Sequence, residues 1–151
     1  MKKTVVILIF LGLTQAGFSK ETGKIWTVYF HSIKGEKIAA YCEVAETEKE
    51  KRRGLMFREK LDQDECMIFV YDTPIILSFW MKNTVIPLSI SFIDSGLQII
   101  DIYDMKPADE TILTSTLPGI YAIEVNKGWY RKNYIFHGSH IQIVKKDMRN
   151  Q

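Results

Sequence analysis

The chain has 151 residues, with 20 Lys and Arg against 18 Asp and Glu, which is enough for one domain with a proper core. Its formal net charge of +2 lacks the clear positive excess by which proteins bind nucleic acid or an anionic membrane. Beyond residue 19 no apolar run approaches the length of a membrane span. The totals therefore argue against a nucleic-acid partner and against a membrane span beyond residue 19.

The first residues have the pattern of a secretory signal peptide. Two lysines precede a short apolar run over residues 4–13, and small residues suited to cleavage follow it. We predict that residues 1–19 are removed, that the mature chain begins between Gly17 and Lys20, and that residues 20–151 form one domain. The predicted location is the periplasm or the cell envelope, with no membrane span in the mature chain. An uncleaved membrane anchor is the alternative interpretation.

Two strand-like runs and a short helix come first in the predicted domain. Residues 25–30 and 37–44 alternate apolar and polar positions and are rich in strand formers. Thr47, followed three residues later by Glu50, forms a capping box. This pattern predicts a short, charged helix over residues 48–53.

The rest of the chain continues as short strands with little helix. A hairpin turn signal at residues 94–96 separates two of them. The further predicted strands are residues 66–71, 86–93, 97–104, 119–125 and 140–145. Residues 128–134 indicate one more helical turn. The predicted class is all-β, a sandwich or barrel with one or two short helices.

The two cysteines, Cys42 and Cys66, both lie in apolar, strand-like runs. Export would place them in an oxidising compartment, where a disulfide can form. Buried cysteine also occurs as a small apolar residue, and the sequence cannot place the two Cα atoms within bridging range. We therefore predict two free, buried thiols.

Several long, unusual sequence motifs occur in a fixed order along the chain. They include "GLMFRE" and "FWMKNTVIPL", and they fall within residues 44–61, 66–74, 79–94 and 121–133. In these motifs the chain resembles domain-of-unknown-function family 192, from about Tyr41 to Val144. The resemblance implies an exported or membrane-proximal bacterial or archaeal domain that folds as a jelly-roll β-sandwich. It implies no activity.

The chain departs from the family pattern at two positions. Cys66 stands where the family pattern leads us to expect Gly, which argues against a disulfide shared by the family. Ser89 stands where we expect Asp, which argues against an acid-based site at that position.

The stretch around residues 80–87 interrupts an apolar region with polar side chains. Amide and hydroxyl groups such as those of Asn83 and Thr84 stabilise turns, and Pro87 suits the start of a strand. The favoured interpretation is a structural corner, in which Trp80 and its neighbours pack inward.

The functional interpretation of the same stretch is a pocket for a polar ligand. Trp80 would form its wall, and Lys82 and Asn83 its polar floor. Arg58 is the fourth candidate, because a guanidinium recognises carboxylate or phosphate, although pairing with a local acid such as Glu59 is the common alternative. Cationic donors beside an aromatic wall are typical of such pockets, so these four residues are the predicted ligand-binding site.

Other side chains suggest no metal site or cofactor. His137 and His140 lack a convincing third zinc ligand nearby. Met56 and Met81 lie in the motifs "GLMFRE" and "FWMKNTVIPL", and thioethers can bind Cu(I). The chain nevertheless lacks a tight Met repeat, so we assign these methionines to core packing.

No known catalytic motif is present, and the acidic residues give no sign of one. Asp101, Asp104 and Glu124 lie on strand patterns, where we expect them on solvated faces. The predicted function is therefore a non-catalytic exported module that binds a small polar ligand or a protein segment. The alternatives are an enzyme acting on a cell-envelope substrate and a Cu(I)-handling protein.

Overall fold

The computed structural model describes residues 24–146, so the predicted signal peptide over residues 1–19 lies outside the described residues. Strands dominate this range, and the prediction of an all-β fold with one or two short helices is confirmed. The elements in chain order are β1 (Ile25–His31), β2 (Lys37–Ala45), α1 (Glu48–Arg53), β3 (Glu65–Ile75), β4 (Ser78–Phe79), β5 (Leu88–Ile93), β6 (Ile99–Met105), β7 (Leu113–Thr114), β8 (Gly119–Asn126), α2 (Trp129–Lys132) and β9 (Ile141–Lys146).

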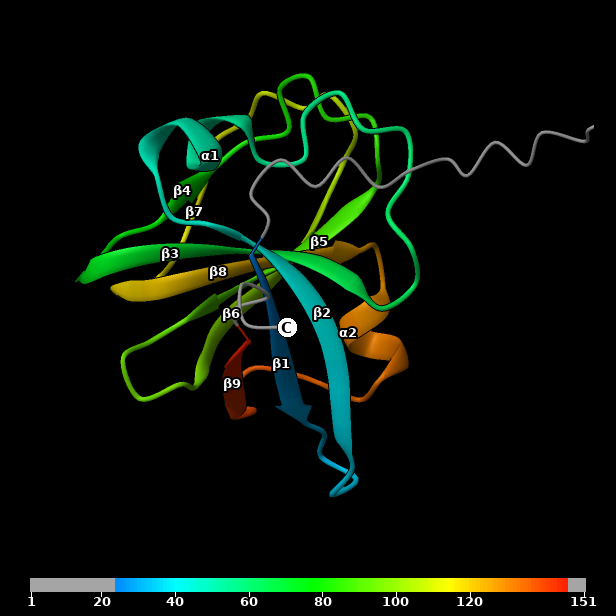
Figure 1. The fold of residues 1–151 in the computed structure, drawn as a ribbon, viewed down its shortest axis with the longest axis vertical. Coiled ribbons are helices and arrows are strands. Elements are labelled where there is room, and N and C mark those ends of the chain that lie inside the picture. The colour runs from blue at the N-terminus through cyan, green and yellow to red at the C-terminus, as the bar shows by residue number, and fades with distance from the viewer. Residues whose placement is uncertain (1–23, 147–151) are drawn as a thin grey trace, which may run out of the picture.

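The strands form one curled seven-stranded sheet and one two-stranded sheet (Figure 1). The order in the large sheet is β6-β5-β8-β3-β2-β1-β9, and β4 pairs with β7 in the small one. Within the large sheet β2 and β3 run parallel, while the other neighbours are antiparallel. A bridge between Gln98 and His140 joins the two edges, and Ile99 N–H donates to the Ser139 carbonyl at 2.9 Å. The sheet is therefore a half-barrel whose edges meet at one end.

Apolar side chains fill both faces of the curled sheet. The inner core lies within the curl and includes Phe30, Ile68, Ile123, Trp129 and Tyr130. The outer core lies on the opposite face and includes Leu55, Phe69, Leu77, Met81 and Phe92. Every residue of β5 is buried, and its neighbour β8 has side chains in both cores. A polar side chain on either face of these central strands therefore lies away from water.

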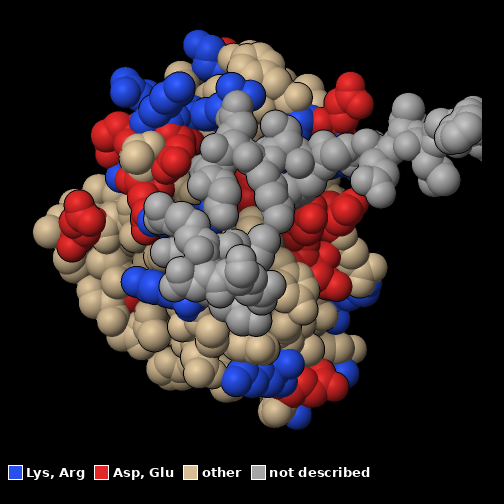
Figure 2. All heavy atoms as spheres, in the orientation of Figure 1, with Lys and Arg blue, Asp and Glu red and all other residues tan. Residues whose placement is uncertain are grey.

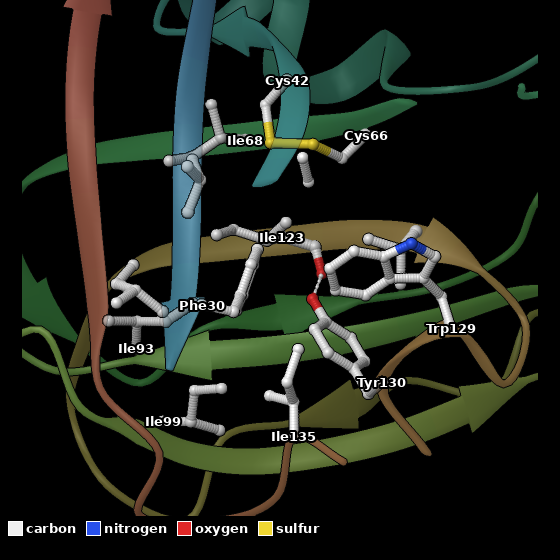
Figure 3. Close-up of a cluster of buried hydrophobic side chains, with 14 of the residues drawn as sticks. Phe30, Cys42, Cys66, Ile68, Ile93, Ile99, Ile123, Trp129, Tyr130 and Ile135 are labelled. Atoms are coloured by element: carbon white, nitrogen blue, oxygen red, sulfur yellow. Dashed lines mark hydrogen bonds between the residues drawn. A yellow bond between two sulfur atoms is a disulfide. The ribbon is translucent and has the colours of Figure 1, made fainter. Parts of the chain in front are cut away.

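A disulfide joins Cys42 to Cys66 in the inner core, so the prediction of two free thiols is wrong. The parallel register of β2 and β3 places the two residues directly opposite each other, with their Cα atoms 4.2 Å apart. Figure 3 shows the bridge beside the buried aromatic residues, where the Tyr130 hydroxyl donates to the Ile123 carbonyl at 2.9 Å. The bridge thus fixes two central strands to each other.

Removing this disulfide should destabilise the fold without changing its architecture. The bridge closes a loop with a sequence separation of 24, for which chain entropy predicts a loss of about 3 kcal/mol in the free energy of unfolding. Urea midpoints of the wild type and of the Cys42→Ala/Cys66→Ala variant would measure the loss. The reduced wild type is the matched control, and an equal midpoint for its oxidised and reduced forms would contradict the prediction.

Candidate functional site

A cavity of about 450 Å³ lies beneath α1, within the size range of small-molecule sites. In Figure 1, α1 sits above β4 and β7, near one end of β3. The cavity is lined from α1 and the segment after it, from β3 and β4, from the turn at residues 80–84, and from β8. The lining residues are Glu48, Lys51, Arg52, Arg53, Gly54, Leu55, Met56, Phe69, Tyr71, Ser78, Phe79, Trp80, Lys82, Asn83, Thr84 and Glu124.

Local sequence fixes the roof of this cavity. The Thr47 hydroxyl accepts from Glu50 N–H at 3.2 Å and the Glu50 carboxylate accepts from Thr47 N–H at 2.9 Å, so the predicted capping box and helix are confirmed. Gly54 ends α1 with φ 49°, a left-handed conformation that favours glycine. A Cβ at this position would lie 3.3 Å from the Phe69 ring. Glycine therefore lets the helix end close against the outer core.

The turn at residues 80–84 forms one side of the cavity, and its backbone is that of a structural corner. Met81 N–H donates to the Asp109 carbonyl at 2.8 Å, and Thr84 N–H donates to the Met81 carbonyl at 3.0 Å. Asn83 has φ 54°, and its carbonyl accepts from Phe57 N–H at 2.9 Å. Backbone bonds and a left-handed residue hold this corner.

Trp80 does not pack inward as predicted. Its side chain is 44% exposed, whereas Met81 beside it is buried in the outer core. Trp80 lines the cavity beneath α1, and together with Met81 it also lines a second cavity of about 200 Å³. Trp80 therefore faces the cavity and solvent, where an aromatic ring is available to a ligand.

The fold brings together three of the four predicted site residues. Trp80, Lys82 and Asn83 line the same cavity, but Arg58 is not part of its lining. The Arg58 guanidinium instead donates to both carboxylate oxygens of Glu43, at 3.0 and 2.5 Å. Glu43 is 1% exposed, so Arg58 neutralises a buried charge and has a structural role.

Glu124 is the cavity residue that the sequence interpretation missed. It was expected on a solvated face, but it is 4% exposed, and burial raises its pKa to about 8. No side-chain hydrogen bond or ion pair joins Glu124 to another residue in the described part of the chain. The signal for it was a single acid between Ile123 and Val125 in a strand apolar enough to be central.

The other two acids on strand patterns have partners. Asp101 accepts from the backbone N–H and the hydroxyl of Thr116, at 2.8 and 2.9 Å. Asp104 accepts from the Ser89 hydroxyl at 2.5 Å, and the Ser89 oxygen accepts from Gly128 N–H at 2.9 Å. Ser89 therefore ties β5 to β6 and to the start of α2. The position where the family pattern suggests Asp lies outside the lining of the cavity beneath α1.

The mouth of the cavity is rich in cations. Lys51 pairs with Glu48 at 2.8 Å and lies 4.4 Å from the centre of the Tyr71 ring. Lys82 lies 5.1 Å from the centre of the Trp80 ring. Figure 2 shows basic side chains gathered over α1, with acidic ones beside them. Cationic groups at an aromatic surface are thus the main feature of the rim.

Tyr71 is a half-buried residue of the cavity lining. Burial raises the pKa of its hydroxyl to about 12, and the nearby charges of Glu48 and Glu124 add to the effect. A polar group that a ligand places beside Tyr71 would be partly shielded from water, and such shielding strengthens a hydrogen bond.

The described residues do not assemble a metal centre. Within residues 24–146 no group of three or more His, Cys, Asp and Glu side chains is placed to hold an ion. The thioethers of Met56 and Met81 line different cavities, the second of about 200 Å³. His137 bonds to the Ile100 carbonyl through Nδ1.

Substitutions of Asn83 should separate its backbone role from any role of its amide. Asn83→Ala should lower the free energy of unfolding by about 1 kcal/mol, because a Cβ without a polar side chain disfavours the left-handed region. Asn83→Gly should unfold at the wild-type midpoint or above it, because glycine accepts φ 54° without strain. Denaturant midpoints of the two variants provide the comparison. Equal destabilisation by both would show that the amide itself holds the corner.

The chain belongs to a family of uncharacterised proteins. The model of domain-of-unknown-function family 192, described as "Uncharacterized ACR", matches residues 30–143. The family that the sequence motifs resemble is therefore confirmed as the family of this chain. Among residues 24–146, no helix combines the length and apolar character that crossing a membrane requires.

Two solved structures are similar over most of the chain. One is a protein from Sinorhizobium meliloti 1021, provisionally described as a transcription regulator, with 28% identity and a TM-score of 0.76 over 80% of this chain and 93% of that one. The other is a protein of unknown function from Novosphingobium aromaticivorans, with 34% identity and a TM-score of 0.75 over 78% of this chain and 84% of that one. No curated protein matches the chain.

Proposed function

We propose that this protein is an exported, non-catalytic module that binds a small polar molecule in the cavity beneath α1. The observation that carries the proposal is the buried carboxyl of Glu124, which lies without a side-chain partner among the described residues in the lining of a cavity of about 450 Å³. Trp80 supplies an exposed aromatic surface to the same cavity. The lining combines aromatic and apolar side chains with charged and polar ones, and polar groups that fix the orientation of a ligand are a feature of small-molecule sites.

Export rests on two independent features. The first is the signal-like pattern over residues 1–19. The second is the disulfide between Cys42 and Cys66, because such bridges persist mainly in oxidising compartments. Intact-mass measurement of the secreted protein would test this part, and retention of residues 1–16 would contradict cleavage.

The second candidate function is that of a cell-envelope enzyme, and the residue that supports it is again Glu124. An acid whose pKa is raised to about 8 can donate a proton at neutral pH, as general acids do. Turnover of an envelope substrate that Glu124→Gln abolishes, while binding of that substrate persists, would favour the enzyme over the binding module.

A thermal-shift screen of small polar metabolites tests the binding proposal. A compound at a hundred times its Kd should add about 2.7 kcal/mol to the free energy of unfolding. We expect active compounds to lose their effect in Trp80→Ala and to keep it in Tyr41→Ala. Tyr41 is the matched control, an aromatic residue that is 52% exposed on β2 and not part of the cavity lining. Compounds that act equally on both variants would place binding elsewhere.

A further inference from the structure

Two buried carboxyls lie in one row across the sheet, and they have different surroundings. Met67 on β3 pairs with Glu43 on β2 and with Glu124 on β8, so the three side chains share the outer face. Glu43 has the guanidinium of Arg58 as its partner. Glu124 faces the cavity, and no other described residue supplies it with a hydrogen bond or an opposite charge. Buried polar groups are normally satisfied, so this carboxyl is available to a ligand.

The surroundings of Glu124 decide which form of its carboxyl a ligand meets. An ionised carboxylate without a partner is costly in an apolar interior, so burial favours the neutral acid. A neutral carboxylic acid carries an O–H donor. The matching group on a ligand is therefore an acceptor, such as a carbonyl oxygen.

The rim of the cavity favours a ligand that carries a negative charge at the end away from Glu124. Four lining side chains are cationic: Lys51, Arg52, Arg53 and Lys82. Besides Glu124, the one acidic side chain of the lining is Glu48, which pairs with Lys51. Lys82 pairs with Glu110 at 3.7 Å, and a pair this exposed contributes little, so an incoming anion can also contact Lys82. An ammonium compound would meet net repulsion at the same rim.

We propose that the cavity takes a small organic anion that presents its acidic group to the cationic rim and a hydrogen-bond acceptor to the carboxylic acid of Glu124. The apolar body of the molecule lies between these ends, against the rings of Phe79 and Trp80. This assignment rests on the proposed function, because it names the class of molecule that the same cavity binds.

Binding should depend on the protonation of Glu124, and the pKa values of Tyr71 and Glu48 in the same lining are shifted away from that of Glu124. Tyr71 on β3 has a pKa raised to about 12. On α1, the pKa of Glu48 is lowered, chiefly by its hydrogen bond to Lys51. The remaining charged side chains of the lining are the cations Lys51, Arg52, Arg53 and Lys82. Loss of affinity between near-neutral and mildly alkaline pH therefore reports on Glu124.

A set of four matched probes tests the proposal by NMR titration of the isotope-labelled protein. The probes are 4-acetylbenzoate, 4-ethylbenzoate without the acceptor, methyl 4-acetylbenzoate without the charge, and 4-methylbenzylammonium with the opposite charge. At about pH 6.5 we expect 4-acetylbenzoate to shift the amide signals of cavity residues and to bind about fivefold more tightly than each of the others. Its affinity should fall about tenfold or more by pH 9.5, as Glu124 becomes an anion.

The conservative variant Glu124→Gln separates this assignment from the proposed function. Its amide keeps a donor but cannot ionise, so the variant should bind 4-acetylbenzoate with no pH dependence over the same range. Equal binding of all four probes in the cavity, or an identical pH profile in Glu124→Gln, would overturn the assignment and leave a binding cavity. If no probe shifts the signals of cavity residues, both the assignment and the proposed function fail.

Discussion

Glu124→Gln should make the protein markedly more stable at alkaline pH and leave its stability almost unchanged in mild acid. In the unfolded chain this carboxyl ionises near its ordinary value of 4.5, whereas in the folded protein burial raises the pKa to about 8. Between these values the unfolded state loses a proton that the folded state keeps. The wild type therefore loses stability as the pH rises through this interval, and glutamine removes that loss.

The expected difference is large for a single substitution. Each pH unit in the interval removes about 1.4 kcal/mol, so the variant should exceed the wild type by roughly 3–5 kcal/mol near pH 9 and by less than about 1 kcal/mol near pH 5. Guanidinium unfolding of both proteins at the two pH values measures it. Because the other ionisable groups are the same in both proteins, their contributions cancel. A constant difference at the two pH values would show that Glu124 is ionised in the folded state.

Arg58→Ala should be among the most destabilising substitutions, although the sequence pattern predicts Arg58 as a ligand-binding residue. The variant leaves the carboxylate of Glu43 buried, with a side chain 1% exposed, and without its guanidinium partner. Breaking a buried pair in this way costs about 3–5 kcal/mol. Urea midpoints measure the loss, and Lys60→Ala is the control, since its pair with Asp62 is exposed on both sides.

A second substitution shows whether the loss arises from the stranded charge. Glu43→Gln in the Arg58→Ala background should recover part of the stability, because an uncharged amide is less costly to bury than a carboxylate. A midpoint for Arg58→Ala equal to that of Lys60→Ala would contradict a structural role. Compounds that bind the cavity should still bind folded Arg58→Ala, because Arg58 is not part of the lining.

Local signals in the sequence predicted the elements of the fold well. Alternation of apolar residues predicted β1 and β2, strand-forming composition predicted β8, and the capping box of Thr47 and Glu50 predicted α1. These signals act over a few residues, so a single sequence contains them. Two short strands, β4 and β7, were missed because each has two residues and pairs across the chain.

Long-range register decides the features that the sequence did not reveal. Cys42 and Cys66 meet because β2 and β3 pair in parallel, and no local pattern specifies that register. Glu124 is buried because β8 has β3 and β5 as neighbours and packs into both cores. The candidate residues around Trp80 and Lys82 line one side of the cavity. Its floor depends on a strand some forty residues further on, which only the fold brings beneath them.

A crystallographic fragment screen of the mature protein is the most direct test of a ligand-binding cavity beneath α1. The account predicts that bound anionic fragments lie between Trp80 and Glu124, with an acceptor atom within about 3 Å of the Glu124 carboxyl and the acidic group near the basic side chains of α1. Binding of fragments only at other places, such as the cavity of about 200 Å³ beside Met105, would contradict it.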